Sequence, residues 1–447
     1  MANETALDAL PIRHVLPKTT GLSTEGHLSI GGCDIRDLAN QYGTPLYIFD
    51  EIDFRGTAQE FRNEFGKRWE NVTILYAAKA YLSSPITKIV NQENLGMDVV
   101  SGTELAIALK AGMAPKNLYF HGNNKSSDEL KEAIQTNGSG RIIVDNFHEL
   151  DLLEKLCREA NLNQSILLRI SPNVDPHTHS KTTTGILDSK FGFPIATGAA
   201  EEAIRQASAS EHLDVCGIHI HLGSPIFELE PYQQGIEIIC EFASEMLSKH
   251  QFSMREFSPG GGFALAYTRD QHPPTIAEYA ELITNTLRNE LTTRNLPNPL
   301  LHIEPGRSLI GRSMIAVYTV GARKEIPDIR TYVSLDGGMA DNIRPAMYGS
   351  KYEAISVDRP LADTEELVTL AGKYCESGDI LVENASLPKL EPQELIAIPA
   401  SGGYNLAMSS NYNMALRPPV IGVKGGESYL LQRRETLEDL TARDISL

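Results

Sequence analysis

The chain has 447 residues, a hydrophobic fraction of 41% and a formal net charge of -18. This length exceeds one ordinary core and predicts two domains. The acidic balance argues against nucleic acid or an anionic membrane as a partner and favours a small molecule. Five cysteines without a CxxC spacing, no signal-peptide pattern and no apolar run long enough for a bilayer predict a cytoplasmic protein with free thiols.

Short apolar runs alternate with longer amphipathic ones from about Tyr47 to Pro305. This alternation is typical of βα units and a parallel sheet, with helical patterns such as 126–135, 147–160 and 232–249 between the strands. Eight strands are predicted, at 72–77, 97–100, 118–120, 141–144, 166–170, 215–221, 254–257 and 300–303. Eight βα units predict a (β/α)₈ barrel, to which we assign residues 48–308.

Beyond the barrel the pattern changes to strands without long helices between them, at 313–320, 331–336, 380–382, 395–398 and 420–423. This predicts a second, mainly β domain formed by residues 309–447 together with residues 1–47. The short β-like runs 28–30 and 46–49 are interpreted as the N-terminal contribution to it. The fold class is therefore α/β plus β.

Every predicted barrel strand has a polar group or glycines at or just beyond its carboxyl end. In chain order these are Lys79, Asp98 with Ser101, His121 with Asn123, Asp145, Arg169, His221, Gly260–Gly262 and Glu304. Loops are polar in general, so one or two such residues would mean little. The carboxyl ends of barrel strands meet at one mouth, where barrel active sites lie, so the full set favours an enzyme.

Lys79 ends the apolar run 72–78. A desolvated amine with a lowered pKa can form a Schiff base with a carbonyl cofactor such as pyridoxal phosphate (PLP). A strand-end lysine that extends to solvent is the alternative, and it is the more frequent case for a single residue. The other strand ends decide in favour of the cofactor.

The segments after the last two predicted strands contain candidate binding groups for the phosphate and for the ring of the cofactor. The glycines of 260–262 and the Gly306-Arg307 pair let backbone N–H groups approach an anion, although tight turns alone also use glycine. Glu304 would be costly to bury without a partner, and a pyridinium nitrogen fits it. A structural ion pair with Arg169 is the alternative for Glu304.

His219 and His221 are two residues apart and share one face of a strand. His221, nearer the mouth, is predicted to stack on a planar cofactor ring, with Ser224 reaching the phosphate. His219 is interpreted as a core histidine. A metal pair is the competing idea, but no third ligand has a suitable spacing, so no metal is predicted. The loop histidines His177 and His179 receive no role.

Two short segments of the second domain also contain candidate site residues. Cys375, flanked by Glu376, is either a buried small hydrophobe or a thiol able to protonate a carbanion. Arg344, followed four residues later by Tyr348, suits a substrate carboxylate, although a surface arginine is the alternative.

Taken in order, these motifs resemble the fold-type III PLP-dependent decarboxylases, and within them the branch that acts on diaminopimelate. The resemblance covers about residues 28–423. It rests on segments 76–79, 98–104, 177–192, 219–224, 260–262, 304–307, 341–348, 375–378 and 409–413. It implies decarboxylation of meso-2,6-diaminopimelate to L-lysine and CO₂, the last step of lysine biosynthesis.

The resemblance also implies residue roles. Lys79 binds PLP, His221 stacks on its ring and Glu304 pairs with its nitrogen. Ser224, Gly261, Gly262, Gly306, Arg307 and Tyr404 surround the phosphate. Cys375 donates a proton after CO₂ leaves, while Arg307, Arg344, Tyr348, Glu376 and Tyr404 bind the substrate. Cys375 and Glu376 reach the opposite subunit's site in such enzymes, so a homodimer with shared sites is implied. Asp98, Glu104, His121 and Asp145 are expected to support these groups.

Two other functions remain open from the sequence. A related decarboxylase of ornithine, lysine, arginine or carboxynorspermidine would use Arg344 differently. A non-catalytic binding protein of the same fold would not need Lys79 and Cys375 together, and the presence of both argues against it.

Overall fold

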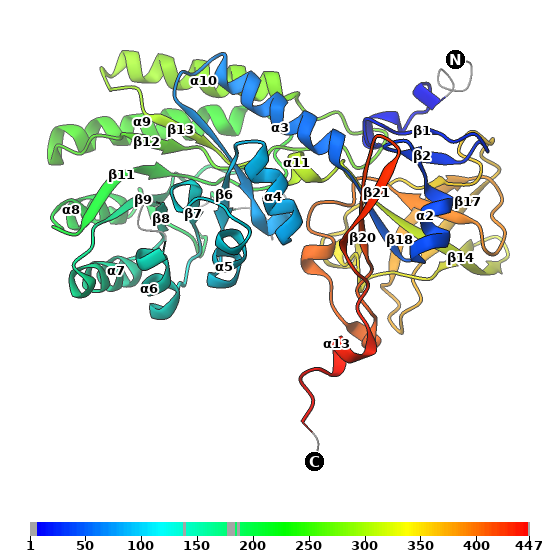
Figure 1. Cartoon of the computed structure of the whole chain (residues 1–447). Helices are drawn as coiled ribbons and strands as arrows, with labels where there is room; N and C mark the ends of the chain where they lie inside the picture. Colours follow the sequence, from blue (N-terminus) through cyan, green and yellow to red (C-terminus); the bar gives the residue numbers. More distant parts are fainter. Residues whose placement is uncertain (1–6, 137–139, 177–183, 186–187, 446–447) are drawn as a thin grey trace. The chain divides into compact units, whose positions relative to one another are not determined.

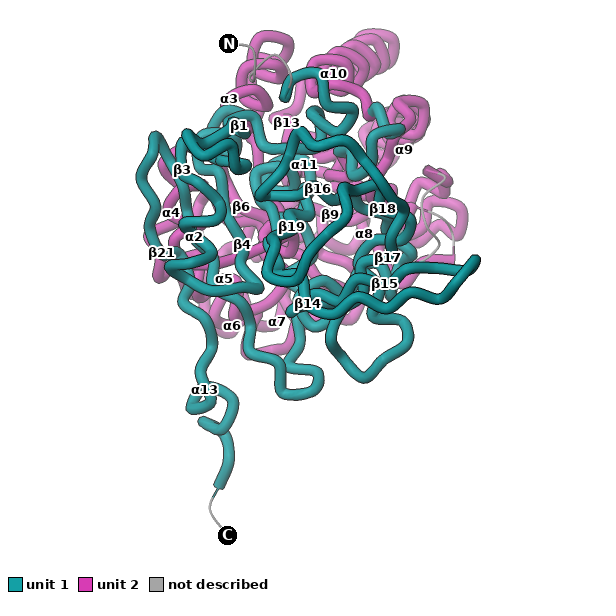
Figure 2. Tube along the Cα trace, turned by 90° about the vertical axis from the view of Figure 1, so that its right-hand side faces the viewer, with its two compact units in different colours: residues 1–56, 265–272, 307–447 teal, residues 57–264, 273–306 magenta. Residues whose placement is uncertain are grey.

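The computed structural model describes residues 7–136, 140–176, 184–185 and 188–445. The chain forms two compact units, coloured separately in Figure 2. Residues 57–264 and 273–306 are called the barrel unit, and residues 1–56, 265–272 and 307–447 the β unit. These bounds differ from the predicted domain boundaries at residues 48–56, 265–272 and 307–308, which belong to the β unit.

The barrel unit contains a closed barrel of parallel strands (Figure 1). Each strand pairs with the next along the chain, and the barrel closes through β13 and β5. The strands are β5 (Val72–Ala77), β6 (Gly96–Val99), β7 (Leu118–Phe120), β8 (Arg141–Val144), β9 (Gln164–Ser171), β11 (Leu213–His219), β12 (Glu256–Ser258) and β13 (Leu300–Ile303), with the short β10 (Phe193–Pro194) beside β9. The predicted (β/α)₈ barrel is confirmed, and four strands have the predicted bounds.

Helices alternate with the barrel strands, because their apolar faces need the outer surface of the sheet. They are α3 (Glu51–Gly66), α4 (Ser84–Gln92), α5 (Gly102–Lys110), α6 (Ser127–Thr136), α7 (Phe147–Ala160), α8 (Ala199–Ser208), α9 (Glu230–His250) and α10 (Ile276–Thr293), with short 3₁₀ turns η2 (Ala78–Ala80) and η3 (Pro115–Asn117). Side-chain caps set several helix starts: Ser101 accepts from the Glu104 N–H and Asn146 from the Glu149 N–H.

The barrel interior is filled with side chains. Leu75, Tyr119, Ile143, Leu167 and Cys216 form one buried cluster across five strands. Arg141 donates to Glu256 at 2.7 Å, and His302 Nε2 lies 3.0 Å from the same carboxylate. A filled interior leaves the ends of the strands as the place for ligands.

The β unit contains two sheets. The larger has the path β18-β17-β15-β14-β4-β20-β21, with β16 and β19 attached. Its strands are β4 (Leu46–Asp50), β14 (Met314–Ile326), β15 (Arg330–Leu335), β16 (Ile355–Ser356), β17 (Glu366–Ala371), β18 (Ile380–Leu387), β19 (Leu395–Ile398), β20 (Val420–Lys424) and β21 (Glu427–Gln432). The smaller sheet joins β1 (Gly21–Leu22), β2 (Leu28–Ile30) and β3 (Cys33–Asp34).

The N-terminal run 46–49 lies within β4, which pairs antiparallel with β14 and parallel with β20. The remaining elements of the unit are short: η1 (Arg13–Val15), α2 (Ile35–Tyr42), α11 (Arg307–Ile310), α12 (Arg344–Tyr348), η4 (Leu406–Met408), η5 (Tyr412–Met414) and α13 (Leu437–Thr441). In the described part of the chain, no helix combines the length and apolar character needed to cross a membrane.

Candidate active site

The mouth of the barrel begins with Lys79, in the turn η2 directly after β5. Strand register places Asp98 of β6 opposite Ala77, and the Lys79 Nζ donates to Asp98 Oδ2 at 2.5 Å. The Asp98 side chain is fully buried, whereas 36% of the Lys79 side chain is exposed. Burial raises the pKa of Asp98, although the nearby Lys79 ammonium opposes this. Lys79 is therefore an accessible amine held in place by a buried acid.

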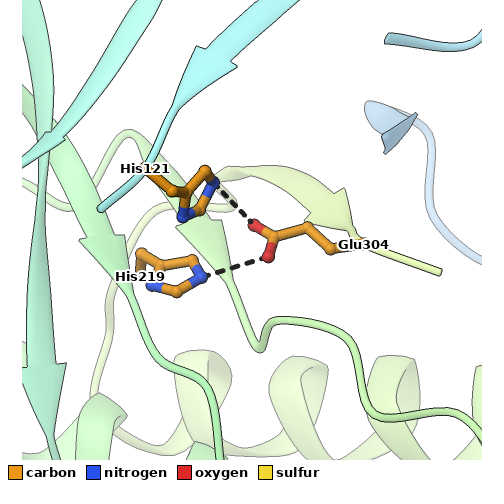
Figure 3. A group of neighbouring side chains, drawn as sticks. All are labelled: His121, His219 and Glu304. Carbon is orange, nitrogen blue, oxygen red and sulfur yellow. Dashed lines mark hydrogen bonds and ion pairs between the residues drawn. The ribbon is translucent and has the colours of Figure 1, made fainter. Parts of the chain in front are cut away.

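Glu304 follows β13 and is buried at the same mouth. Its two oxygens have different partners: Ser258 Oγ donates to Oε1 at 2.7 Å, and His219 Nε2 lies 3.1 Å from Oε2 (Figure 3). Burial alone would raise the pKa of Glu304, but the contact with His219 and the nearby Lys79 ammonium outweigh it and hold this pKa well below the usual value. The carboxylate is ionised and ready for a cationic ligand group.

The alternative ion pair between Glu304 and Arg169 does not form in the structure. Arg169 Nη1 instead lies 3.8 Å from Asp145 Oδ1, and the guanidinium stacks on Phe191 at 4.3 Å from the ring centre. Asp145 also accepts from the Gly192 N–H at 3.1 Å. His219, interpreted from the sequence as a core histidine, is the residue that contacts Glu304. This contact could not be predicted, because β11 and β13 come together only in the folded barrel.

His221 and the glycine run 260–262 lie against each other. The Gly261 N–H donates to His221 Nδ1 at 3.3 Å, and Tyr232 Oη donates to the Gly261 carbonyl at 2.8 Å. Burial and the nearby cations Arg169 and Lys79 lower the pKa of His221 well below its usual value. The imidazole is thus neutral and suited to stacking on a flat ring.

The glycines are required because this loop packs on backbone. A Cβ at Gly261 would lie 2.2 Å from the Glu304 carbonyl oxygen, and one at Gly262 would lie 2.4 Å from the Gly223 carbonyl oxygen. Gly262 also has a φ of +102°. Close packing alone therefore explains these two glycines, and contact with a phosphate remains a proposal. Gly306 is buried, and Ser224 is partly exposed.

Gly261→Ala is expected to lower the free energy of unfolding by about 1–3 kcal/mol, because the added methyl group must displace backbone at the end of β13. It should also weaken PLP uptake, because the displaced segment carries Glu304. Thermal unfolding and absorbance after PLP addition measure the two effects. Gly56→Ala is the matched control, since a Cβ there meets no atom within 4 Å. Equal behaviour of the two variants would contradict the prediction.

A second group of predicted residues lies in the β unit. Arg307 Nη1 donates to Tyr267 Oη at 2.6 Å, and the Arg307 guanidinium lies 4.8 Å from the Tyr404 ring centre. The Arg344 guanidinium lies 4.6 Å from the Tyr267 ring centre and donates to Tyr352 Oη. Arg344 is buried, and among the described residues no carboxylate lies within 4.0 Å of it. The surface-arginine alternative for Arg344 is therefore wrong.

Sequence reasoning missed Tyr267 and Tyr352. Both are buried, their rings meet edge to face at 5.3 Å, and Tyr352 Oη donates to Asn405 Oδ1 at 3.1 Å. The two arginines lower the pKa of Tyr267 against the opposing effect of burial. Tyr267 lies 40 residues from Arg307, and the eight-residue spacing between Arg344 and Tyr352 matches no regular helix or strand period, so no local motif marks either tyrosine.

Cys375 and Glu376 are exposed, and Tyr348 is partly exposed. The Cys375 N–H donates to Asn413 Oδ1 at 3.0 Å, and Tyr412 Oη donates to the Cys375 carbonyl at 3.2 Å. The neighbouring Asp379 carboxylate accepts from the Met339 and Tyr374 N–H groups. These bonds fix the backbone of the segment and leave the thiol accessible. The alternative of a buried small hydrophobe is wrong for Cys375.

The structure thus joins Lys79, Asp98, His121, His219 and Glu304 at the barrel mouth, and joins Arg307, Arg344 and Tyr404 through tyrosines in the β unit. Glu104 supports the mouth by accepting from the Val100 N–H at 2.7 Å. His177 and His179 lie outside the described residues.

The barrel mouth fits PLP by its donor set. It offers an amine, an ionised carboxylate and a neutral imidazole, and the buried atoms Asp98 Oδ1 and His121 Nε2 have no hydrogen-bond partner in the described part of the chain. His121, His219 and Glu304 also place ligand atoms within 4.8 Å of one another, a spacing compatible with a metal. No third ligand for a metal could be found from the sequence, because these residues lie on or just after three different strands.

Comparisons with known proteins agree with this donor set. Residues 53–311 match the family described as pyridoxal-dependent decarboxylase, pyridoxal binding domain. The diaminopimelate decarboxylase of Bacillus subtilis (strain 168) is 42% identical over 427 residues, covering 96% of this chain and 97% of the relative. That of Bacillus methanolicus is 41% identical over 424 residues, covering 95% and 98%.

Solved structures give the same result. Diaminopimelate decarboxylase from M. jannaschii in complex with L-lysine matches with a TM-score of 0.89 and 32% identity, covering 96% of this chain and 98% of that one. The Helicobacter pylori enzyme complexed with L-lysine matches with a TM-score of 0.84 and 29% identity, covering 91% and 98%.

Proposed function

Because the chain belongs to the family of pyridoxal-dependent decarboxylases, we propose that it converts meso-2,6-diaminopimelate to L-lysine and CO₂, the last step of lysine biosynthesis. The relatives named above carry this activity and align over nearly the whole chain. In the structure, the observation that carries the substrate assignment is the buried guanidinium of Arg344, which has no carboxylate partner among the described residues.

PLP is the cofactor, and when bound it accepts the electron pair that remains as CO₂ leaves. Lys79 would hold it through the amine that Asp98 positions. Glu304, kept ionised at the floor of the mouth, would pair with the ring nitrogen, and neutral His221 would lie against the ring. The phosphate contacts are assigned to Ser224, Gly261, Gly262, Gly306, Arg307 and Tyr404.

The distal end of the substrate is assigned to the arginine group of the β unit. Arg344 would bind the second carboxylate through its planar fork, and Tyr352 fixes that fork from one side. Arg307, Tyr348, Glu376 and Tyr404 are assigned to the remaining polar groups of the substrate. A substrate without the second carboxylate would leave Arg344 buried and uncompensated, which disfavours its binding.

We further propose a cytoplasmic homodimer in which Cys375 and Glu376 complete the partner's site. The exposure of both side chains on an ordered segment supports this arrangement. All five cysteines are free, which supports a reducing compartment.

The test of this function is CO₂ release by the PLP-loaded protein. The substrates are meso-diaminopimelate, L-ornithine, L- and D-lysine, L-arginine and carboxynorspermidine at equal concentration. A strong preference for meso-diaminopimelate with L-lysine as product is expected. Preference for a substrate lacking the distal carboxylate would identify a related decarboxylase instead, and absence of any turnover with bound PLP would identify a binding protein.

Cys375→Ala is expected to lower kcat for meso-diaminopimelate by about 10²-fold, the lower range for loss of a general acid, because water can reach this exposed position. Absorbance of bound PLP should not change. Steady-state kinetics and absorbance measure the two effects. Cys33→Ala, at a buried cysteine, is the control for loss of a thiol. An undiminished kcat would show that Cys375 is not the proton donor.

Mixing Cys375→Ala with an inactive Lys79 variant tests the shared site. If Cys375 acts in the partner's site, mixed dimers regain one intact site and part of the activity returns. No recovery after verified subunit exchange would contradict the shared arrangement.

A further inference from the structure

His121 follows β7 and lies between two buried carboxylates. Its Nε2 is 3.9 Å from Asp98 Oδ1 and 3.9 Å from Glu304 Oε1. Both distances exceed a hydrogen bond, so the nitrogen is near both acids and bonded to neither. Figure 3 shows the His121 and His219 rings on the same side of the Glu304 carboxylate, with one nitrogen of each directed at it.

The two acids serve different ends of the site. Asp98 accepts from Lys79 through Oδ2, which leaves Oδ1 for another donor. Glu304 accepts from Ser258 and contacts His219 on the other side. The groups therefore lie next to one another in the order Lys79, Asp98, His121 and Glu304.

Several ionisable groups face the His121 ring from neighbouring elements, namely Asp98 on β6, Glu304 after β13, His219 on β11, Lys79 after β5 and Arg169 on β9. His219 is the nearest ring, with centres 4.8 Å apart and planes at 74°. Burial lowers the pKa of His121 well below its usual value; the Glu304 carboxylate opposes this effect, whereas Lys79 and Arg169 reinforce it. The imidazole is therefore neutral and can donate one N–H at the carboxylate side.

We propose that His121 is a positioning residue whose Nε2–H is directed into the space between Asp98 and Glu304, so that the ionisation of the Lys79 amine and that of Glu304 depend on each other. Two buried acids that face the same space repel when both are ionised, and a neutral donor between them reduces that repulsion. The proposal rests on the proposed function only in requiring PLP at the mouth.

The experiment is a pH titration of the visible absorbance of PLP bound to the wild type, His121→Gln and His121→Leu. Without the donor, Asp98 takes up a proton more readily and supports the positive charge at Lys79 less. The absorbance midpoint of His121→Leu is expected to move to lower pH by up to about one pH unit, because the N–H dipole no longer stabilises the ionised Asp98. Glutamine keeps a neutral donor at a similar reach, so its midpoint should stay near that of the wild type.

His302→Leu is the matched control. His302 is fully buried in the same barrel, and its Nε2 contacts a carboxylate, Glu256, at 3.0 Å. Its loss should leave the absorbance midpoint unchanged. An unchanged midpoint in His121→Leu, or an equal shift in His302→Leu, would overturn the proposal.

Two measurements keep the test decisive if the leucine variant does not fold. His121→Phe removes the nitrogen while retaining a ring, and the same shift is expected. In the wild type, the ¹⁵N chemical shifts of the His121 ring should follow the cofactor's absorbance transition, and constant shifts through that transition would overturn the coupling. Failure of the wild type to decarboxylate meso-diaminopimelate would defeat the proposed function alone, since the titration needs only bound PLP.

Discussion

Lys79→Arg is expected to remove the visible absorbance of the PLP-loaded protein and to lower kcat/KM for meso-diaminopimelate by at least about 10³-fold, because arginine keeps the charge but not an amine able to bond the cofactor. The arginine can still form an ion pair with Asp98, so the variant should fold. Absorbance, borohydride trapping and steady-state kinetics measure the effect.

The control for this substitution is Lys110→Arg, at an exposed position in the last turn of α5. It should match the wild type in absorbance and kinetics. A Lys79→Arg protein that can be trapped by borohydride at full yield would place the cofactor's bond on another lysine. A colourless but fully active variant would show that the reaction does not depend on bound PLP.

The barrel and its mouth could be predicted because they depend on local patterns. A short apolar run followed by a polar residue identifies both a strand and its carboxyl end, so Lys79, Asp98 and Glu304 are found without knowing the fold. β17 and β21 were missed for the converse reason. β17 has three successive buried residues in its middle, and β21 carries mostly exposed or partly exposed residues at the sheet edge, so neither has a clear period of two.

The partners of the site residues were harder to predict. His219 contacts Glu304 across 85 positions of sequence, and Tyr267 contacts Arg307 across 40. Such pairs are set by strand register and by the return of segment 265–272 to the β unit, neither of which has a local signature. Sequence reasoning therefore identified the chemically active residues better than the residues that orient them.

Arg344→Lys is expected to lower kcat/KM for meso-diaminopimelate by about 10²–10³-fold, since a lysine ammonium cannot make the two parallel hydrogen bonds of a guanidinium to a carboxylate. The stacking on Tyr267 and the bond to Tyr352 are lost with the fork, so the effect includes misplacement of the remaining charge. The measurement is kcat/KM for meso-diaminopimelate and for L-lysine, compared as a ratio. Cofactor absorbance should be unchanged.

The ratio of kcat/KM for meso-diaminopimelate to kcat/KM for L-lysine distinguishes a loss of substrate specificity from a general loss of activity. If Arg344 binds the distal carboxylate, the preference for meso-diaminopimelate over L-lysine collapses, because only the first substrate carries that group. Arg359→Lys, at an arginine paired with Glu394, is the matched control and should keep the wild-type ratio. An Arg344→Lys enzyme that loses activity but keeps its preference would assign Arg344 to the integrity of the β unit. The second carboxylate would then need another cation.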